Sequence, residues 1–310
     1  MELAVDYKDL TRGSSKHRIV TIGNFDGVHL GHRAVLHHAR EEAASHGLEL
    51  AVLTFEPHPA ELLKPDGPKL RLAEPERKAL LLAECGADLI LAQRFDDRFS
   101  KLSARTFASD VLVDALKASR VIVGANFRFG KGRQGGVATL TRLGEELGFE
   151  VRGKQLVRSE NGEVSSSRIR KLIMNGDVAL GRELLGRCHE VPGTVEPGKG
   201  QGRILGYPTL NLGNIKVLLP APGIYAARCD TGNRLENAAV YIGDRPTMGY
   251  GFSVEAHLLD FDGDLYGKRV VISFVDRIRG DMKFPNPESL THQMAQDVDR
   301  ARQLLRAHRD

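Results

Sequence analysis

Cysteine is scarce in this sequence, and its few copies form no familiar framework. Cys85, Cys188 and Cys229 lie far apart and fall in no CxxC or Cys/His spacing. This distribution excludes a fold stapled by disulfides and a structural zinc site of the usual spacing. It predicts a protein of the reducing cytoplasm.

Long apolar runs and a large excess of one charge are missing as well. No stretch approaches the roughly 18 apolar residues of a membrane span, and residues 1–13 carry charges where a signal peptide has an apolar core. The 44 Lys and Arg residues nearly balance the 40 Asp and Glu residues, which leaves a formal charge of +4. Because so mild a charge does not indicate nucleic-acid binding, we expect neither a nucleic acid nor a membrane as partner.

The first half of the chain alternates short β-branched runs with longer periodic segments. Strands are expected at Ile19–Ile22, Leu50–Phe55, Leu89–Ala92, Val121–Val123 and Glu150–Leu156, and helices at His32–His46, Glu74–Glu84, Thr106–Leu116 and Ala138–Leu147. This alternation predicts a parallel sheet covered by helices, with ligands bound at the carboxyl ends of the strands.

The pattern changes after two further expected helices, Ser167–Asn175 and Val178–Leu185. Gly, Pro and Asn then punctuate short strand-like runs at Gly223–Cys229, Ala238–Ile242, Val254–Leu259 and Val270–Val275. These runs predict a small antiparallel barrel or sandwich. A final amphipathic helix is expected over Pro287–Arg306, with Leu290, Met294, Val298 and Leu304 facing inward.

The most informative segment of the first half is Thr21–His32 (TIGNFDGVHLGH), where an expected strand gives way to a helix. Its glycines permit a close approach to a phosphate chain, and the helix N-terminus offers N–H groups and the positive end of the helix dipole. His29 and His32 can donate hydrogen bonds to charge that builds on an α-phosphate. A Gly-rich turn whose histidines only cap the helix is the alternative interpretation.

A second segment, Val164–Arg170 (VSSSRIR), places hydroxyl groups directly before an expected helix. Its serines can cap the helix, while Arg168 and Arg170 can reach toward phosphate oxygens. Taken alone, it also fits an ordinary N-cap with solvated arginines. An HxGH sequence near the start of a parallel αβ domain, joined to this segment near its end, resembles the nucleotidylyltransferase superfamily, whose members attach AMP or CMP to a phosphate.

Further segments narrow the resemblance. Leu53–Pro59 (LTFEPHP), Leu91–Val113 and Val123–Gly136 (VGANFRFGKGRQGG), taken with GNFDGVHLGH, resemble the adenylyltransferase module of bacterial riboflavin kinase/FAD synthetase proteins. The resemblance implies that an oxygen of the FMN phosphate attacks the α-phosphorus of ATP and that pyrophosphate leaves. Positioning and electrostatics then supply most of the catalysis, with a metal ion neutralising the triphosphate.

The same resemblance implies roles for individual residues, with His29 and His32 as catalytic hydrogen-bond donors. The ATP site is implied at Gly23, Asn24, Phe25, Asp26, Gly31, Ser165, Ser166, Arg168 and Arg170, and the flavin site at Phe55, Pro57, His58, Asn126, Phe127 and Arg128. Phe55 and Phe127 also fit plain core aromatics. Two departures are small: Ser167 stands where Thr is usual, and Gly136 stands where an acidic or amide residue often appears.

The second half lacks the GK[ST] of a P-loop but has a glycine-rich loop, Gly193–Asn211 (GTVEPGKGQGRILGYPTLN), bounded by two strand candidates. Backbone N–H groups and a few cations can bind phosphates there, and Thr209 and Asn211 present neutral oxygens that suit a hydrated Mg²⁺. A mobile barrel loop is the alternative. The loop resembles the riboflavin kinase domain of the same family when it is taken with PGIYA (222–226), IGDRPT (242–247), VEAHLLDFDGDLYGK (254–268) and RGDMKF (279–284).

This second resemblance implies a phosphoryl transfer. Glu255 would be the general base that accepts the proton of the ribityl 5′-hydroxyl, and Arg279 would lie near the flavin. Thr209 and Asn211 would bind Mg²⁺ or another divalent ion. The kinase ATP site is implied at Gly198, Lys199, Gly200, Arg203, Gly206 and Pro208. Without the motif, Glu255 also fits an outward-facing strand residue beside His257.

One departure bears on the kinase. Gly186–Glu190 reads GRCHE where the family commonly has GRPY or GRPF, so that an early turn and an aromatic side chain on the flavin side are expected to be lost. Cys188 is then a small substitute and not a redox residue. The departure supports the alternative of an adenylyltransferase with an impaired or altered kinase half.

The sequence therefore predicts two domains, 1–185 and 186–310. The first is an α/β parallel, doubly wound nucleotidylyltransferase domain, and the second is a small antiparallel β-barrel with a C-terminal helix. The expected function is phosphorylation of riboflavin to FMN and adenylylation of FMN to FAD, with ATP as co-substrate and a divalent ion, in the cytoplasm. A non-catalytic flavin-binding regulatory or carrier protein is a further alternative, but it would not require the histidines, the metal-binding pair or Glu255.

Overall fold

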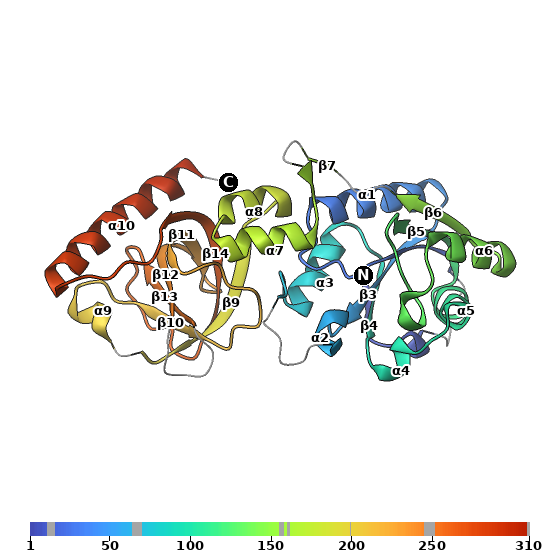
Figure 1. Cartoon of the computed structure of the whole chain (residues 1–310), viewed down its shortest axis with the longest axis horizontal. Helices are drawn as coiled ribbons and strands as arrows, with labels where there is room; N and C mark the ends of the chain where they lie inside the picture. The colour runs from blue at the N-terminus through green and yellow to red at the C-terminus, as the bar shows by residue number, and fades with distance from the viewer. Residues whose placement is uncertain are drawn as a thin grey trace. The chain divides into compact units, whose positions relative to one another are not determined.

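The computed structural model divides the chain into two compact units (Figure 1). It describes residues 1–10, 16–63, 70–154, 158–159, 162–198, 200–244 and 252–308. Unit 1 comprises Met1–Pro68 and Glu74–Ser165, and unit 2 comprises Lys69–Ala73 and Ser166–Asp310. Each unit has its own sheet and its own core.

Unit 1 is built on a six-stranded sheet in the order β1-β4-β3-β2-β5-β6, in which all neighbouring strands are parallel. The strands are β1 (Glu2–Ala4), β2 (Arg18–Ile22), β3 (Glu49–Glu56), β4 (Leu89–Arg94), β5 (Ala118–Gly124) and β6 (Glu150–Lys154). From β2 the chain moves to β3 and β4 on one side and then crosses to β5 and β6 on the other. The strand order therefore reverses between β2 and β5, and such a switch point is where doubly wound sheets bind ligands.

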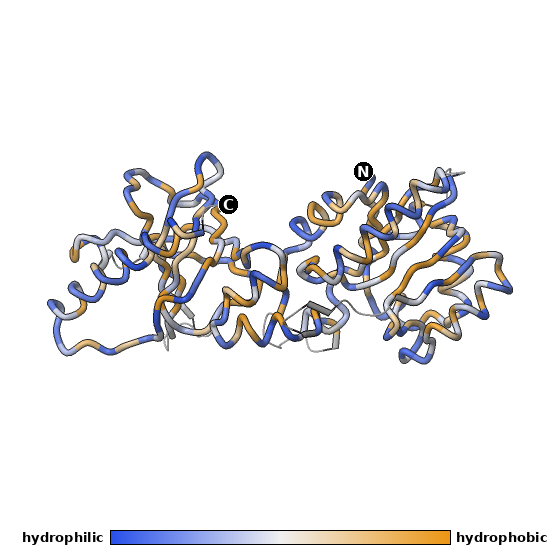
Figure 2. The backbone as a smooth tube through the Cα atoms, turned by 90° about the horizontal axis from the view of Figure 1, so that it is seen from above, coloured by the Kyte–Doolittle hydropathy of each residue, from blue (hydrophilic) through white to orange (hydrophobic). Residues whose placement is uncertain are grey.

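Alternating residues along the strands of unit 1 supply two separate cores. Ile19, Leu50 and Val52 pack under α1 (Leu30–Ser45) and α3 (Pro75–Glu84), while Val20 and Leu53 pack under η2 (Phe107–Ala115) and α6 (Val137–Leu147). Because strand side chains point to opposite faces in turn, a strand covered on both faces is apolar throughout. The hydrophobic stretches of Figure 2 are accordingly concentrated in the strands of the sheet.

Short elements fill the connections of unit 1. They are η1 (Tyr7–Asp9), α2 (Pro59–Leu63), α4 (Asp97–Ser100), α5 (Ala104–Thr106), η3 (Lys131–Arg133) and the small hairpin β7 (Arg158–Ser159) with β8 (Gly162–Glu163). The helix expected over Thr106–Leu116 is instead a single turn, α5, followed by the π-helix η2. Leu116 N donates to Val111 O at 3.0 Å, one residue farther along than in an α-helix. The spacing of apolar residues does not distinguish a π-helix from an α-helix here, since the same face is buried in either.

Unit 2 begins with α7 (Ser166–Asn175) and α8 (Val178–Leu185) and continues as a closed antiparallel barrel. The barrel order is β10-β13-β12-β11-β14-β9, with β9 and β10 paired to close it. Its strands are β9 (His189–Glu196), β10 (Leu210–Gly213), β11 (Gly223–Asp230), β12 (Leu235–Asp244), β13 (Phe252–Leu258) and β14 (Arg269–Arg279). The short helix α9 (Gln201–Ile204) lies in the glycine-rich loop, where no helix was expected, and α10 (Pro287–Ala307) follows the barrel. The predicted fold class is confirmed.

The turn between α7 and α8 is fixed to the barrel by Arg277. Its guanidinium donates from Nη1 to Asn175 O at 3.2 Å and from Nη2 to Pro222 O at 2.8 Å. A Cβ at Gly176 (φ +85°) would lie 2.8 Å from Arg277 Nη1, so the turn requires glycine both for its backbone and for this contact. Beside them, burial raises the pKa of Tyr225 to about 12, and its hydroxyl donates to Ala221 O at 2.6 Å. α7 and α8 are thus integral to unit 2.

The inward face of α10 is the expected one, and Val298 and Leu304 pack against the core, but the most buried residues of this face were not predicted. Asp297, Ala301 and Leu305 are its fully buried residues, whereas the four residues expected to face inward, Leu290, Met294, Val298 and Leu304, are half-buried. Asp297 can be buried because its carboxylate is paired with a guanidinium of the barrel, described below. A pattern that counts only apolar side chains finds this helix face but does not show that a buried ion pair lies within it.

Candidate active sites

The connection between β2 and α1 is a compact turn with little freedom. Phe25 and Val28 adopt positive φ values of 49° and 38° and are almost completely buried, at 3% and 0% exposure. The turn is tied to β3, because Gly23 N donates to Leu53 O at 3.1 Å and Thr54 Oγ1 donates to Asn24 O at 3.0 Å. Non-glycine residues in this strained conformation are typical of functional sites.

His29 is the N-cap of α1 and its tautomer follows from that role. Its Nδ1 accepts a hydrogen bond from His32 N at 3.2 Å. Because the accepting nitrogen carries no proton, a neutral His29 carries its proton on Nε2, which is then a donor. The ring of His29 is 4% exposed and stacks on the half-buried ring of His32, with 3.6 Å between centroids and 15° between planes.

The two stacked histidines are held from both sides. Phe25 contacts His32 edge-on, with 5.1 Å between ring centroids. A Cβ at Gly31 would lie 3.2 Å from both the His29 ring and Val164 O, so the first turn of α1 packs closely against the segment that precedes Ser165. The histidines, the buried Asp26 and the N-terminus of a 16-residue helix therefore meet at the carboxyl end of β2. Such a helix end favours an anion.

The second phosphate motif falls at the division between the units. Ser165 is the last residue of unit 1, and Ser166 is the first residue of α7 and of the larger segment of unit 2. Arg168 is half-buried, and Arg170 donates from Nε to Leu70 O at 2.7 Å within unit 2. The predicted role of these four residues at ATP stays a prediction.

The residues predicted to bind the flavin in unit 1 lie at the end of β3 or just after β3 and β5. Phe55 is half-buried and packs edge-on against Phe95 at 5.6 Å, and Phe127 stacks on Phe129 at 5.5 Å; both rings border the core. Asn126 and Arg128 are exposed just beyond β5, and Pro57 and His58 just beyond β3, exposed and half-buried. These residues lie at or after the ends of strands on either side of β2, at the carboxyl edge of the sheet.

Two further features support that edge. Lys78 of α3, 5% exposed, donates from Nζ to Phe55 O at 3.2 Å and forms an ion pair with Glu56, which fixes the end of β3. A Cβ at Gly136 would lie 3.4 Å from Cζ of Arg128. The side chain missing at Gly136 therefore leaves room for the Arg128 guanidinium. Lys78 was missed by sequence reasoning, since helical spacing gives no sign of which lysine is buried.

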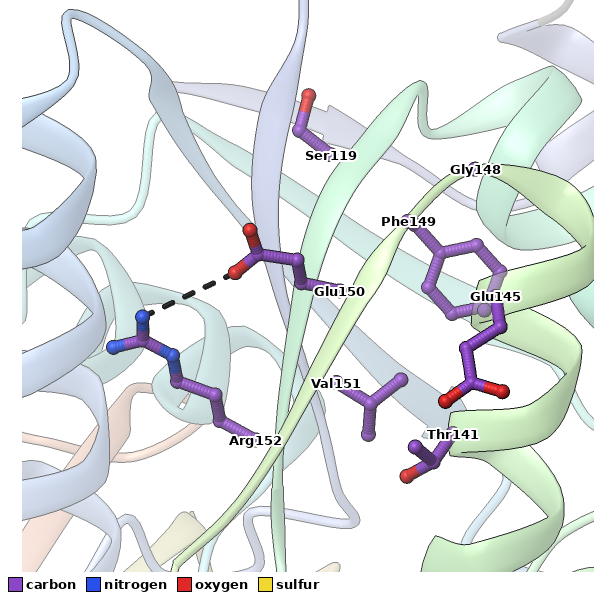
Figure 3. Close-up of a pocket in the computed structure, with 9 residues that line it drawn as sticks. Ser119, Thr141, Glu145, Gly148, Phe149, Glu150, Val151 and Arg152 are labelled. Carbon is purple, nitrogen blue, oxygen red and sulfur yellow. Dashed lines mark ion pairs between the residues drawn. The ribbon is translucent and has the colours of Figure 1, made fainter.

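A cavity of about 520 Å³ lies at the opposite edge of the sheet, at the amino ends of β5 and β6 (Figure 3). Glu150 and Arg152 on β6 face each other there as an ion pair of 3.9 Å, and Glu145 of α6 lies on the other side. None of the predicted site residues lines this cavity. Ligands of parallel sheets bind at the carboxyl edge, so we assign it no role.

In unit 2 the register of the barrel strands brings the predicted kinase residues together. Asn211 on β10 is paired with Glu255 on β13, Glu255 with Tyr241 on β12, Tyr241 with Ile224 on β11, and Ile224 with Arg279 on β14. All five are half-buried. Their neighbours Leu212, Val254, Ile242 and Tyr225 are buried. Because successive side chains alternate, the first set forms one row on the outer face of the barrel while the second fills its interior.

The glycine-rich loop lies against this row. A Cβ at Gly198 would be 2.6 Å from Cγ of Asn211, and a Cβ at Gly202 would be 3.2 Å from Oγ1 of Thr209. The loop can therefore approach both predicted metal ligands only with glycine at these positions. Gly200, Arg203, Gly206 and Pro208 are exposed along the same loop, and Lys199 lies outside the described residues.

Thr209 also borders a cavity of about 320 Å³. The cavity is formed by the 203–210 segment on one side and by the loop after β13 on the other, and its lining includes Arg203, Pro208, Phe261, Asp262 and Tyr266. His257 on β13 supports the 203–210 segment, because its Nδ1 is hydrogen-bonded to Pro208 O at 2.8 Å and so holds the turn before Thr209 in place. The cavity is a candidate site for a small polar ligand next to Thr209 and Asn211.

The oxygen donors at this place fit a hydrated divalent ion. Thr209 and Asn211 offer a hydroxyl and an amide oxygen, and Glu255 lies beside Asn211 in register. Such donors suit Mg²⁺ that keeps several waters. Among the described residues, no three His, Cys, Asp or Glu side chains gather in a group that could hold a metal.

Arg279 is held rigidly at the other end of the row. Its Nε donates to Asp297 Oδ1 at 2.9 Å and its Nη2 donates to Asp297 Oδ2 at 2.7 Å, an arrangement that fixes the guanidinium plane. Gln293 Nε2 donates to the same carboxylate at 3.1 Å, and Phe284 lies under the guanidinium at 5.7 Å. α10 thus orients a residue that the sequence predicts near the flavin.

The GRCHE segment has a structural role that differs from the expectation. His189 is 0% exposed at the start of β9, and its Nε2 is hydrogen-bonded to Leu218 O at 2.7 Å. The position is fully buried, so a hydrogen-bonded imidazole stands where the family commonly has a tyrosine or phenylalanine ring. Cys188 packs against the core cluster that joins α10, through Ala301 and Leu305, to Ala226 and Val275 of the barrel.

Comparison with known proteins agrees with this geometry. Residues 11–168 match the FAD synthetase family and residues 185–305 match the riboflavin kinase family. The bifunctional riboflavin kinase/FMN adenylyltransferase of Escherichia coli K12 is 37% identical over 98% of both chains. The protein of the same name from Listeria monocytogenes is 33% identical over 91% of this chain and 90% of its own.

A solved structure shares the whole fold. The crystal structure titled "Macrolide-efflux Protein from Streptococcus pneumoniae" superposes with a TM-score of 0.88 at 28% identity, covering 97% of this chain and 98% of the other. In the part of this chain that the structure describes, no helix has the length and apolar character needed to span a bilayer. Two family matches, full-length relatives and a parallel sheet followed by a closed barrel lead to one conclusion: the chain belongs to the bifunctional riboflavin kinase/FMN adenylyltransferase family.

Proposed function

We propose that unit 1 of this enzyme supplies the site that converts ATP and FMN into FAD and pyrophosphate. The observation that supports the proposal best is the stacked pair of His29 and His32 at the N-terminus of α1, beside the switch point of the sheet. An oxygen of the FMN phosphate attacks the α-phosphorus of ATP, and the bond to the leaving pyrophosphate breaks. The Nε2–H of His29 and the His32 ring donate hydrogen bonds to the charge that builds on the α-phosphate.

The flavin and the nucleotide would be bound by residues at the carboxyl ends of neighbouring strands. Asn126, Phe127 and Arg128 after β5 bind the FMN together with Phe55 at the end of β3 and Pro57 and His58 directly after it. The rigid turn 23–26 and Gly31 receive the ATP. Since the phosphate itself is the nucleophile, the residues only bind, orient and neutralise charge.

For unit 2 the proposed reaction is transfer of the γ-phosphoryl group of ATP to riboflavin, which yields FMN and ADP. Glu255 accepts the proton of the ribityl 5′-hydroxyl while the hydroxyl oxygen attacks the γ-phosphorus. The register of Glu255 with Asn211 supports this role, because it places the base beside the phosphate-binding loop. The nucleotide lies along the 198–208 loop and in the 320 Å³ cavity, and Arg279 faces the flavin.

Mg²⁺ or a similar divalent ion would be held by Thr209 and Asn211. When bound, it neutralises charge on the ATP phosphates. Because Gly198 and Gly202 have no Cβ atom, the loop can pass close to Asn211 and Thr209 without displacing their side chains.

The functional boundary is proposed at 185/186, although α7 and α8 belong to unit 2 by their packing. A cytoplasmic location suits the three free cysteines, Cys85, Cys188 and Cys229.

One assay tests the proposal as a whole. Purified protein is incubated with riboflavin, ATP and Mg²⁺, and the flavins are separated by chromatography. We expect both FMN and FAD. FAD formed only from supplied FMN would instead indicate an impaired kinase, and bound but unchanged riboflavin and FMN would indicate a carrier.

Gly198→Ala tests the approach of the loop to Asn211. The new Cβ would lie 2.6 Å from Cγ of Asn211, so the side chain must move by about an ångström. A displacement of that size lowers phosphoryl transfer by about 10²-fold, while FMN-to-FAD conversion stays unchanged. The control is Gly153→Ala, whose Cβ would be 3.5 Å from its nearest neighbour. Unaltered riboflavin phosphorylation by Gly198→Ala would contradict the assignment of Asn211.

A further inference from the structure

His257 attaches the end of the glycine-rich loop to the strand that carries the proposed base. It lies on β13 two residues after Glu255, so the alternation along the strand directs both side chains to the outer face of the barrel. Its Nδ1 is hydrogen-bonded to Pro208 O at 2.8 Å, a partner 49 positions away in the chain. Because Pro208 directly precedes Thr209, this bond fixes the backbone next to a predicted metal ligand.

The ring of His257 also supports the residue before Pro208. It contacts the ring of Tyr207 edge-on, with 5.4 Å between centroids and 75° between planes. Tyr207 N donates to Gly202 O at 2.8 Å, and a Cβ at Gly202 would overlap Tyr207 O. The turn of α9 therefore packs directly on the 207–209 segment, which in turn is held by His257.

This attachment lies where the backbone ladder ends. The pairing of β10 with β13 begins at Leu210, whose partner is Ala256, so that Thr209 lies just outside the ladder. The imidazole of His257 extends the connection between the two segments by one further contact, from side chain to backbone. Thr209 and Pro208 line the cavity of about 320 Å³, and the wall that they form is therefore fixed before a ligand binds.

The direction of the hydrogen bond follows from its acceptor. A carbonyl oxygen only accepts, so Nδ1 of His257 carries a proton and donates to Pro208 O. Asparagine has an N–H donor at the same number of bonds from Cβ as Nδ1 of histidine, whereas phenylalanine has a ring without a donor. Substitution by these two residues therefore separates the hydrogen bond from the packing of the ring.

We propose that His257 is a positioning residue of the kinase centre, which holds Thr209 and the end of the glycine-rich loop in the place where ATP and its divalent ion bind. This inference rests on the proposed nucleotide and metal site at Thr209 and Asn211. A loop that is already in place loses less free energy to ordering when the ligand arrives. Loss of the attachment should therefore weaken the binding of ATP and of the ion, but not of riboflavin, which is proposed to lie near Arg279 at the other end of the row.

Three variants of the full-length enzyme test the proposal. His257→Phe keeps a ring against Tyr207 but has no donor, His257→Asn keeps a donor in the place of Nδ1 but has no ring, and His257→Ala has neither. For each variant four quantities are measured in FMN formation: the KM for ATP, the Mg²⁺ concentration that gives the half-maximal rate, the KM for riboflavin, and kcat.

His257→Phe and His257→Ala should each raise the KM for ATP and the half-maximal Mg²⁺ concentration by about five- to tenfold, as the loss of one hydrogen bond predicts. The KM for riboflavin and kcat should change by less than about twofold, because the loop is in place once ATP has bound. His257→Asn should stay within about twofold of the parent in all four quantities, since it retains the bond. A residue that only stabilised the barrel would instead affect both substrates alike.

His292→Ala is the matched control, because it removes an exposed histidine of α10 and should leave both reactions unaltered. FMN-to-FAD conversion should be unchanged in every variant. An unchanged KM for ATP in His257→Phe, or a KM for ATP in His257→Asn as high as in His257→Ala, would overturn the inference. If His257→Phe does not fold, the comparison of His257→Ala with His257→Asn decides it.

Gly198→Ala shows which proposal has failed. Impaired phosphorylation in Gly198→Ala with a normal His257→Phe refutes this inference alone. Normal phosphorylation in Gly198→Ala refutes instead the nucleotide and metal site on which the inference rests.

Discussion

Replacing Glu255 with glutamine is expected to abolish FMN formation and to leave FMN-to-FAD conversion largely intact. The amide preserves the size and the hydrogen-bonding reach of the side chain but cannot accept a proton. General-base catalysis contributes about 10²–10⁴-fold to a rate. The rate of riboflavin phosphorylation should therefore fall by at least about 10²-fold. The measurement is chromatographic quantification of FMN from riboflavin and, separately, of FAD from FMN.

Glu236→Gln provides the matched control for this experiment. Glu236 is also half-buried on the barrel, but its register partner is Cys229, toward the other end of β11 from Ile224. The control should retain both activities and the melting temperature of the parent. Riboflavin phosphorylation at a normal rate in Glu255→Gln would remove Glu255 from the role of base.

The second large effect is expected for His32→Ala, which should lose mainly FAD formation. The variant removes one donor to the developing charge on the α-phosphate and also the ring that stacks on His29 at 3.6 Å. Loss of a single such donor costs a few kcal/mol of transition-state stabilisation, about 10²–10³ in rate. His29 should remain the cap of α1, because it accepts from the backbone N–H of residue 32, which alanine also has.

His37→Ala is the control on the same helix. His37 lies on the exposed face of α1, where its side chain is 79% accessible, and it should affect neither reaction. If His32→Ala slowed FMN formation and FAD formation equally, the assignment of the two reactions to two separate sites would be wrong.

Much of the fold was predictable because the signals are local. Strands such as β2 and β3 are apolar on both faces, and the helices between them have a periodic apolar side, which together predict a sheet covered on both sides. The barrel strands β11 to β14 were predicted in the same way. β9 and β10, which close the barrel, were expected only as strand candidates without bounds at the two ends of the glycine-rich loop, since their residues include Pro192, Gly193 and Asn211 and give a weak strand pattern.

The errors share a physical cause. The π-helix η2 keeps the buried face that an α-helix would have, so the apolar spacing cannot tell the two apart. The burial of Asp297 on α10 was missed because its partner, Arg279, is distant in sequence. The structural role of His189, in the GRCHE segment, was missed for a similar reason. Its hydrogen-bond partner, the carbonyl oxygen of Leu218, is distant in sequence and is brought next to His189 only by the folded barrel.

The sequence by itself determined what is local in this protein: the glycines and histidines of the β2–α1 turn, the order of a parallel half and an antiparallel half, and the loop that precedes Thr209 and Asn211. Only the tertiary structure decided which side chains meet. Strand register placed Tyr241 beside Glu255, a distant aspartate fixed Arg279, and the N-cap hydrogen bond set the tautomer of His29. Turn and helix-start preferences are properties of neighbouring residues, whereas cross-strand pairs and buried ion pairs join residues far apart in the chain, so their partners exist only once the chain has folded.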